Sequence, residues 1–92
     1  MARRRILYTA QAVTSLRHLP PLAKPAIKKL IEQLAEAPQS GKPLRHELAG
    51  FFSARHQRWR VIYRLDDARR AVVVYLIEHR QTVYETLRTF LE

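Results

Sequence analysis

Arginine residues recur between Ser53 and Tyr84 at a spacing that can place several guanidinium groups on one side of a sheet. Charged and apolar residues alternate there, as they do in a strand with one buried and one exposed face. The outward positions are Arg58, Arg60, Ile62 and Arg64, so three of the four are arginine. A planar guanidinium group binds phosphate oxygens through paired hydrogen bonds. The pattern therefore favours a surface that binds a polyanion.

Each of these residues also has a purely structural interpretation. The arginines can simply solvate the exposed face of an amphipathic strand. Trp59 is interpreted as core, although an exposed tryptophan would be a platform for base stacking. His79 and Arg80 follow an apolar run, where polar groups of a site can gather. His79 is interpreted as a hydrogen-bonded residue at a strand end, yet histidine is also the side chain best suited to proton exchange near neutral pH.

The charge balance points to the kind of partner. The chain has 92 residues, with 17 Lys and Arg against 8 Asp and Glu, and its formal net charge is +9. A chain of this length is expected to form one domain, which we assign to residues 1–92. An apolar fraction of 47% argues against general disorder. The excess of positive charge predicts a polyanionic partner.

Several classes of chemistry are disfavoured. The chain has no cysteine, which excludes disulfides and thiol catalysis. Its histidines are scattered without the spacing of metal ligands, so we predict no metal and no cofactor. The apolar run after the arginines at positions 3–5 ends at Tyr8, too early for a signal sequence or a membrane span. We therefore expect a cytoplasmic protein without a membrane partner.

The first half of the chain predicts a strand and two helices. Residues 3–8 are a candidate strand, and Thr9 can cap a helix that begins at Ala10. Proline at positions 20 and 21 ends that helix. The second helix is expected from about Lys24 to Ala37, because Pro25 fits only the first turn of a helix. The apolar stripes are Ala12, Val13, Leu16 and Leu19 in the first helix and Ile27, Leu30, Ile31 and Leu34 in the second.

The second half predicts three strands and a last helix. We expect a loop at residues 39–43, extended chain at residues 44–48, and a turn or bulge at Ala49 and Gly50. Strands follow at residues 51–56, at 58–65 and, covered on both faces, at 71–77. Residues 66–70 join the last two as a hairpin, and residues 82–91 form the final helix. The predicted fold class is α+β, in the order β-α-α-β-β-β-α, with a two-helix hairpin packed on a mainly antiparallel sheet.

Short motifs occur along the chain in a set order. They are L-x-G at 48–50, S-x-R at 53–55, R-V-I-Y at 60–63, H-R at 79–80 and V-Y at 83–84. Together with the chain length and element order, this arrangement resembles the RelE/ParE superfamily of bacterial toxins. The resemblance extends over essentially the whole chain. It implies a RelE-like fold and a small basic toxin that a cognate acidic antitoxin neutralises.

The resemblance also implies an activity and a site. RelE-like members cut messenger RNA in the ribosomal A site, whereas ParE-like members inhibit DNA gyrase. In the RelE-like case Arg60 and Arg80 would hold the scissile phosphate and Tyr84 would lie near the 2′-hydroxyl group. These three residues are the predicted catalytic set. The predicted phosphate-binding residues are Arg55, His56, Arg58 and His79.

One departure from the family pattern keeps the target open. RelE-like nucleases commonly carry two lysines on the strand before the arginine cluster, and Phe51 and Ser53 occupy those positions here. The missing lysines favour a gyrase inhibitor that is not an enzyme. A relative that binds nucleic acid or an antitoxin without toxicity is a third possibility. We prefer the ribosome-dependent endoribonuclease, which inhibits translation, because the arginines and Tyr84 occur together and phosphodiester cleavage requires such groups.

Overall fold

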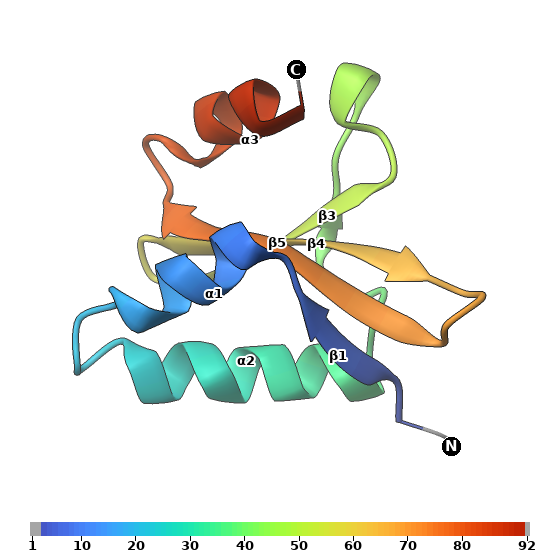
Figure 1. The fold of residues 1–92 in the computed structure, drawn as a ribbon, viewed down its shortest axis with the longest axis horizontal. Coiled ribbons are helices and arrows are strands. Elements are labelled where there is room, and N and C mark those ends of the chain that lie inside the picture. The colour runs from blue at the N-terminus through green and yellow to red at the C-terminus, as the bar shows by residue number, and fades with distance from the viewer. Residues whose placement is uncertain (1–2, 92) are drawn as a thin grey trace.

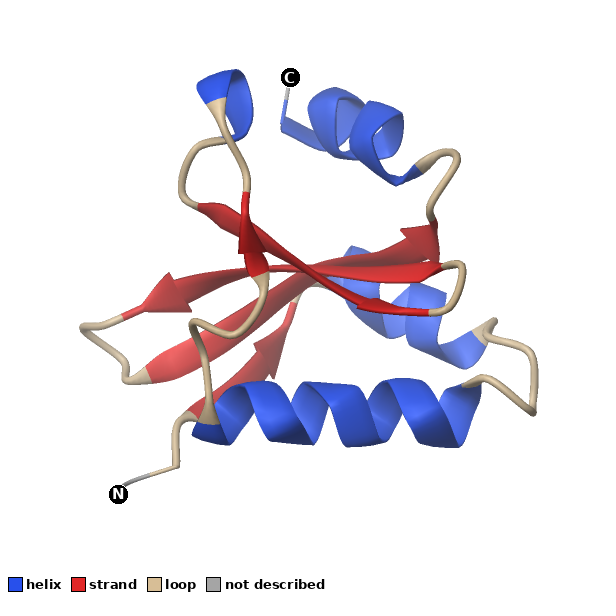
Figure 2. Ribbon diagram, turned by 180° about the vertical axis from the view of Figure 1, so that it is seen from behind, coloured by secondary structure: helices blue, strands red, loops and turns tan. Residues whose placement is uncertain are grey.

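The computed structural model describes residues 3–91, so the ends of the predicted domain, residues 1–2 and 92, lie outside the described residues. A five-stranded sheet in this part of the chain has two helices on one face and a third on the other (Figure 1). Figure 2 shows the same layers from behind. The elements are β1 (Arg5–Tyr8), α1 (Ala10–Arg17), α2 (Lys24–Glu36), β2 (Lys42–Pro43), the 3₁₀ helix η1 (His46–Leu48), β3 (Phe51–His56), β4 (Trp59–Asp66), β5 (Ala71–His79) and α3 (Val83–Leu91).

The strand order is β1-β5-β4-β3-β2, and β1 alone pairs parallel to its neighbour. The prediction of a mainly antiparallel sheet is therefore confirmed. β5 lies between β1 and β4, which explains its long apolar run. Val72, Val74 and Leu76 are at most 1% exposed, because helices cover both faces of this strand.

The predicted starts of the two N-terminal helices are confirmed. The Thr9 hydroxyl accepts a 3.0 Å hydrogen bond from the backbone N–H of Ala12 at the start of α1. α2 begins at Lys24, so Pro25 lies in its first turn, where the missing N–H leaves no helical hydrogen bond unmade. Ile27 and Ile31 of α2 are buried against the sheet.

Two apolar cores lie on opposite faces of the sheet. The helix-pair core includes Ile27, Ile31 and Leu34 of α2 with Ala54, Val61 and Tyr63 of the sheet. The α3 core consists of Leu48, Phe51, Ile62, Leu76, Val83 and Leu87. The second core corrects the expected exposed face of β4. Ile62 is fully buried there, because Val83 and Leu87 of α3 cover the middle of that face.

Two further expectations for local structure are corrected. The predicted loop at residues 39–43 contains β2, which pairs with β3, so the sheet has one strand more than predicted. The prediction of extended chain at residues 44–48 is wrong, because His46–Leu48 form η1. This turn points Leu48 into the α3 core, and it includes His46 with a φ of 57°.

Among residues 3–91, no helix combines the length and the apolar character needed to cross a bilayer.

Candidate functional site

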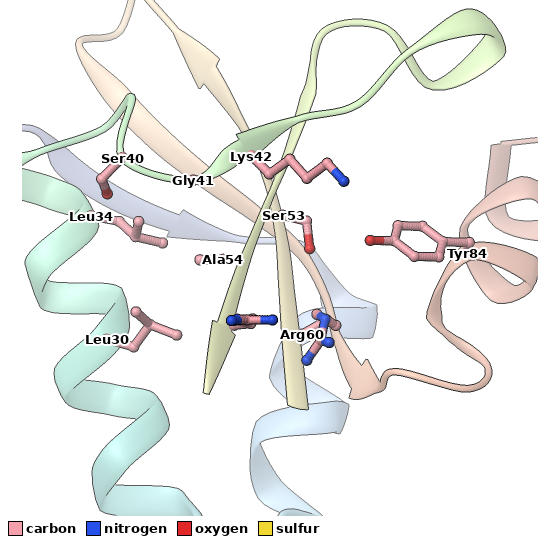
Figure 3. Close-up of a pocket in the computed structure, with 10 residues that line it drawn as sticks. Leu30, Leu34, Ser40, Gly41, Lys42, Ser53, Ala54, Arg60 and Tyr84 are labelled. Carbon is pink, nitrogen blue, oxygen red and sulfur yellow. The ribbon is translucent and has the colours of Figure 1, made fainter. Parts of the chain in front are cut away.

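A cavity of about 520 Å³ opens beside β2 and β3 at one side of the sheet, between α2 and the start of α3 (Figure 3). We call it the first lobe. Its polar lining comes from the loop after α2, from strands β2, β3 and β4, and from α3: Ser40, Lys42, Ser53, Arg55, Arg60 and Tyr84. Leu30, Leu34 and Ala54 supply the apolar part of the wall.

Strand register places the cationic groups side by side. Arg55 of β3 is the direct partner of Arg60 of β4, and Lys42 of β2 is the partner of Ser53. Directly paired residues in antiparallel strands point to the same face, with Cβ atoms about 4.5–5.5 Å apart. Lys42, Ser53, Arg55 and Arg60 therefore share the face that α3 covers.

Backbone carbonyl groups orient the Arg60 guanidinium. Its Nη1 atom donates to the carbonyl oxygen of Gln57 at 2.9 Å and to that of Trp59 at 3.0 Å. Within residues 3–91, neither Arg55 nor Arg60 forms an ion pair with a carboxylate. Two neighbouring guanidinium groups that are not neutralised in this way create a strong attraction for an anion.

The packing of α3 places Tyr84 at the cavity. Val83 and Leu87 are buried in the α3 core, and the Thr86 hydroxyl donates a 3.0 Å hydrogen bond to Oε1 of Glu78 on β5. Tyr84, next to Val83, is half-buried. Its hydroxyl group extends toward Ser53 across the lobe (Figure 3).

A buried tyrosine anchors the loop that carries Lys42. The Tyr63 hydroxyl donates to the carbonyl oxygen of Pro38 at 2.8 Å and accepts from the backbone N–H of Gly41 at 3.0 Å. Burial raises the pKa of Tyr63 above its usual value, against the smaller opposing effect of the Gly41 hydrogen bond. A Cβ atom at Gly41 would lie 2.5 Å from that hydroxyl oxygen, so glycine is required here.

Lys42 is the residue that sequence reasoning missed. The sequence predicts a loop at this position, and the family pattern places its lysines on the strand that holds Phe51 and Ser53. Lys42 instead reaches the same cavity from the neighbouring strand, opposite Ser53. The signal for a strand here is the lysine directly before a proline, because the residue before proline favours extended backbone.

The other predicted site residues lie outside this lobe. Arg80 is exposed just after β5, and its backbone N–H donates to the carbonyl oxygen of Arg58 at 2.7 Å. His56 and His79 pair with Trp59 from the two neighbouring strands, on the face opposite Arg55 and Arg60. The Trp59 ring is half-buried against the helix-pair core and meets the His79 ring edge to face at 5.9 Å. The structure thus joins Arg55, Arg60 and Tyr84, and places Arg58 and Arg80 together at the sheet rim.

The site offers cations and hydroxyl groups as ligands. Among the described residues, no group of three or more His, Cys, Asp or Glu side chains is placed to hold a metal ion. The lining of the first lobe suits a phosphate diester, whose charge the guanidinium and ammonium groups would balance.

The chain belongs to the ParE toxin family of type II toxin–antitoxin systems, because the model of that family matches residues 6–84. It is therefore a toxin of such a system, close in sequence to toxins named RelE and RelG.

Known relatives agree with this assignment. The chain is 40% identical over 81 residues to Toxin RelG of Mycobacterium tuberculosis, a match that covers 86% of this chain and 93% of that protein. It superposes on a chain of the toxin–antitoxin complex RelBE2 from M. tuberculosis with a TM-score of 0.79 and 38% identity, over 86% of this chain and 100% of that one. The isolated RelE toxin of E. coli has the same fold, with a TM-score of 0.73 and 17% identity over 97% and 99% of the two chains. The predicted RelE-like fold is confirmed.

Proposed function

We propose that this toxin is a ribosome-dependent endoribonuclease that cleaves messenger RNA in the cytoplasm. The observation that carries the proposal is the direct pairing of Arg55 with Arg60 on the sheet face that meets Tyr84 across the first lobe. Its cognate partner is an acidic antitoxin, because relatives form toxin–antitoxin complexes and this chain has a net charge of +9.

The proposed reaction is an internal transesterification of RNA in the first lobe. The 2′-oxygen of the RNA attacks the neighbouring phosphorus, and the bond to the 5′-oxygen breaks as that oxygen takes a proton from solvent. The products are a 2′,3′-cyclic phosphate and a free 5′-hydroxyl end. Arg55 and Arg60 stabilise the negative charge that grows on the phosphoryl oxygens. Tyr84, whose hydroxyl group points into the first lobe, is the proposed acceptor of the proton of the 2′-hydroxyl group.

Lys42 takes the place of the lysines missing from β3. It enters the lobe from β2 with its ammonium group directed toward Tyr84 (Figure 3). Its positive charge adds to that of Arg55 and Arg60 and helps to stabilise the negative charge that grows on the phosphoryl oxygens. The ribosome holds the RNA in a reactive geometry and so supplies orientation that a small protein lacks.

The remaining predicted residues have roles at the periphery. Arg58 at the sheet rim is proposed to contact a phosphate outside the first lobe. Arg80, beside it at the same rim, is proposed to move toward Arg60 when RNA binds and to act there in catalysis. His56 and His79 stay predicted phosphate ligands of the same rim.

A gyrase inhibitor is the second candidate. Phe51, at a position where a RelE-like lysine is expected, is 3% exposed in the α3 core, with the Arg64 guanidinium 4.9 Å from its ring centre. That position cannot present a lysine to the lobe without opening the core. This observation favours a toxin that acts by binding DNA gyrase.

Primer extension on transcripts after induction of the toxin distinguishes the two candidates. We expect cuts within translated codons from the wild-type protein. Arg60→Ala should lower the cleavage rate by about 10²–10³-fold, as loss of an oriented electrostatic group does. Arg64→Ala is the matched control, because Arg64 lies on the same face of the same strand but outside the first lobe. DNA breaks with intact transcripts would establish the gyrase inhibitor instead.

A further inference from the structure

A second cavity of about 520 Å³ adjoins the first and shares Lys42 and Tyr84 with it. We call it the second lobe. Its other walls come from the segment around η1 and from α3. The lining residues in these walls include Leu44, Arg45, His46, Leu48 and Arg88. The two lobes therefore form one groove on either side of the Tyr84 side chain.

The second lobe is cationic. Lys42, Arg45 and Arg88 line it, and its described lining includes no carboxylate. Arg88 donates a 2.9 Å hydrogen bond from Nε to Oε1 of Glu47, which lies outside the lining. This contact holds one edge of the guanidinium group and leaves the side chain 55% exposed. Its remaining N–H groups are available to an anion.

The floor of the second lobe is apolar and structurally restrained. Leu48 is buried in the α3 core, and Leu44 and Tyr84 pack against that core. His46 adopts a φ of 57°, in the left-handed region that residues with a side chain seldom adopt. The turn at η1 thus keeps Leu48 inside while Arg45 and His46 remain exposed.

We propose that the second lobe binds the nucleotide adjacent to the scissile phosphate in single-stranded RNA, with Arg45 and Arg88 at its phosphate. This inference rests on the proposed nuclease function and extends its site. Ligand cavities commonly enclose about 300–1,000 Å³, so each lobe is large enough for one nucleotide. The bases of single-stranded RNA are free to stack on aromatic rings, and Tyr84 is the ring between the lobes.

Binding of short oligonucleotides tests this assignment without requiring cleavage. The probes are fluorescein-labelled 2′-O-methyl oligouridylates of two and of four nucleotides, measured by anisotropy over a range of salt concentrations. We expect wild-type protein to bind the longer probe at least tenfold more tightly. The double variant Arg45→Gln and Arg88→Gln should lose that gain and keep its affinity for the shorter probe. Its salt slope for the longer probe should fall by about 1.4, because a single-stranded contact contributes about 0.7.

Matched controls separate the lobe from overall charge. The double variant Arg69→Gln and Arg70→Gln removes the same charge at the β4–β5 turn, and Arg69, like Arg88, contacts a carboxylate. It should retain the wild-type preference for the longer probe. Glu47→Gln keeps an oxygen acceptor for Arg88 and removes a competing negative charge, so it should tighten binding of the longer probe about twofold to threefold.

Specific results would overturn the assignment. The assignment is wrong if the double variant Arg45→Gln and Arg88→Gln still prefers the longer probe as strongly as wild-type protein does. Circular dichroism checks that this variant is folded. The assignment is also wrong if a glutamate decapeptide binds as tightly as the longer probe and loses that affinity when the same two arginines are replaced. That result would assign the second lobe to a peptide. The nuclease proposal is tested separately, by comparing RNA cleavage by the wild-type protein with cleavage by the Arg60→Ala variant.

Discussion

The backbone N–H of Gly41 donates a 3.0 Å hydrogen bond to the hydroxyl oxygen of Tyr63, and this contact positions the residue next in sequence, Lys42. Tyr63 is fully buried in the helix-pair core, on the face of the sheet opposite the Lys42 side chain. A core residue on one face thus holds a proposed active-site residue on the other.

Gly41→Ala should therefore impair both stability and activity. The new methyl group would lie 2.5 Å from the Tyr63 hydroxyl oxygen, so either the loop or the ring must move. We expect a loss of about 1–3 kcal/mol in the free energy of unfolding, as overpacking costs. RNA cleavage should fall further than stability alone explains, because Lys42 shifts. Urea unfolding and a cleavage assay at equal folded fraction measure the two effects.

Gly50→Ala is the control for that substitution. Gly50 has a φ of 95°, and its nearest contact would be the flexible Arg64 side chain at 3.3 Å. Backbone strain should cost about 1–2 kcal/mol, with cleavage per folded molecule unchanged. Equal loss of cleavage in both variants would show that the Gly41 contact has no special effect on the site.

Lys42→Ala should lower the cleavage rate by about 10²-fold, because an oriented charge in the first lobe is lost. The free energy of unfolding should change by less than about 0.5 kcal/mol, since Lys42 is exposed. Lys42→Arg should recover part of the rate by keeping the charge. Lys29→Ala on the exposed side of α2 is the matched control. Wild-type cleavage by Lys42→Ala would remove this residue from the mechanism.

Thr86→Val should destabilise α3 and with it the position of Tyr84. Thr86 donates to Oε1 of Glu78, while Oε2 of Glu78 is buried without a hydrogen-bond partner among the described residues. The valine leaves the carboxylate with neither bond, which we expect to cost about 1–3 kcal/mol. Thr89→Val is the control, because the Thr89 hydroxyl donates to Glu85 within the exposed face of the same helix. Equal denaturation midpoints for the two variants would contradict this role of Glu78.

Stability should fall at alkaline pH. Burial raises the pKa of Tyr63 in the folded protein, whereas a tyrosine in an unfolded chain has a pKa of about 10. The folded state holds the phenol proton more tightly, so this stabilisation is complete below a pH of about 10 and is lost as the pH rises through the folded pKa. Urea unfolding at a series of pH values measures the decline.

Two phenylalanine variants identify the groups responsible. The pKa of Tyr8 is also raised, by partial burial and then by Glu32, so Tyr63→Phe should reduce the alkaline decline and Tyr8→Phe should reduce it separately. Tyr63→Phe should also lower stability near neutral pH by about 1 kcal/mol, since the Pro38 and Gly41 groups lose their partner. An alkaline decline of wild-type size in both variants would exclude these phenols as its source.

Local patterns in the sequence were sufficient for most of the elements. Thr9 and Pro25 mark helix starts through chemistry that acts within one turn, and the valines of β5 indicate a strand covered on both faces. The cover over Ile62 was not predictable in this way. The alternation in β4 indicates one buried face, and the second is buried only because α3, which lies later in the chain, packs on it.

By itself, the sequence determined the type of fold, the excess of positive charge and the residue types available for phosphate chemistry. Only the tertiary structure decided which of these residues lie close together. Arg55 joins Arg60 through the β3–β4 register, whereas His56, one residue further, points to the opposite face because strand side chains alternate. Lys42 and Tyr84 meet at the same cavity because β2 pairs with β3 and α3 packs over the sheet. Such meetings depend on pairing and burial between distant segments, and no local spacing in the chain encodes them.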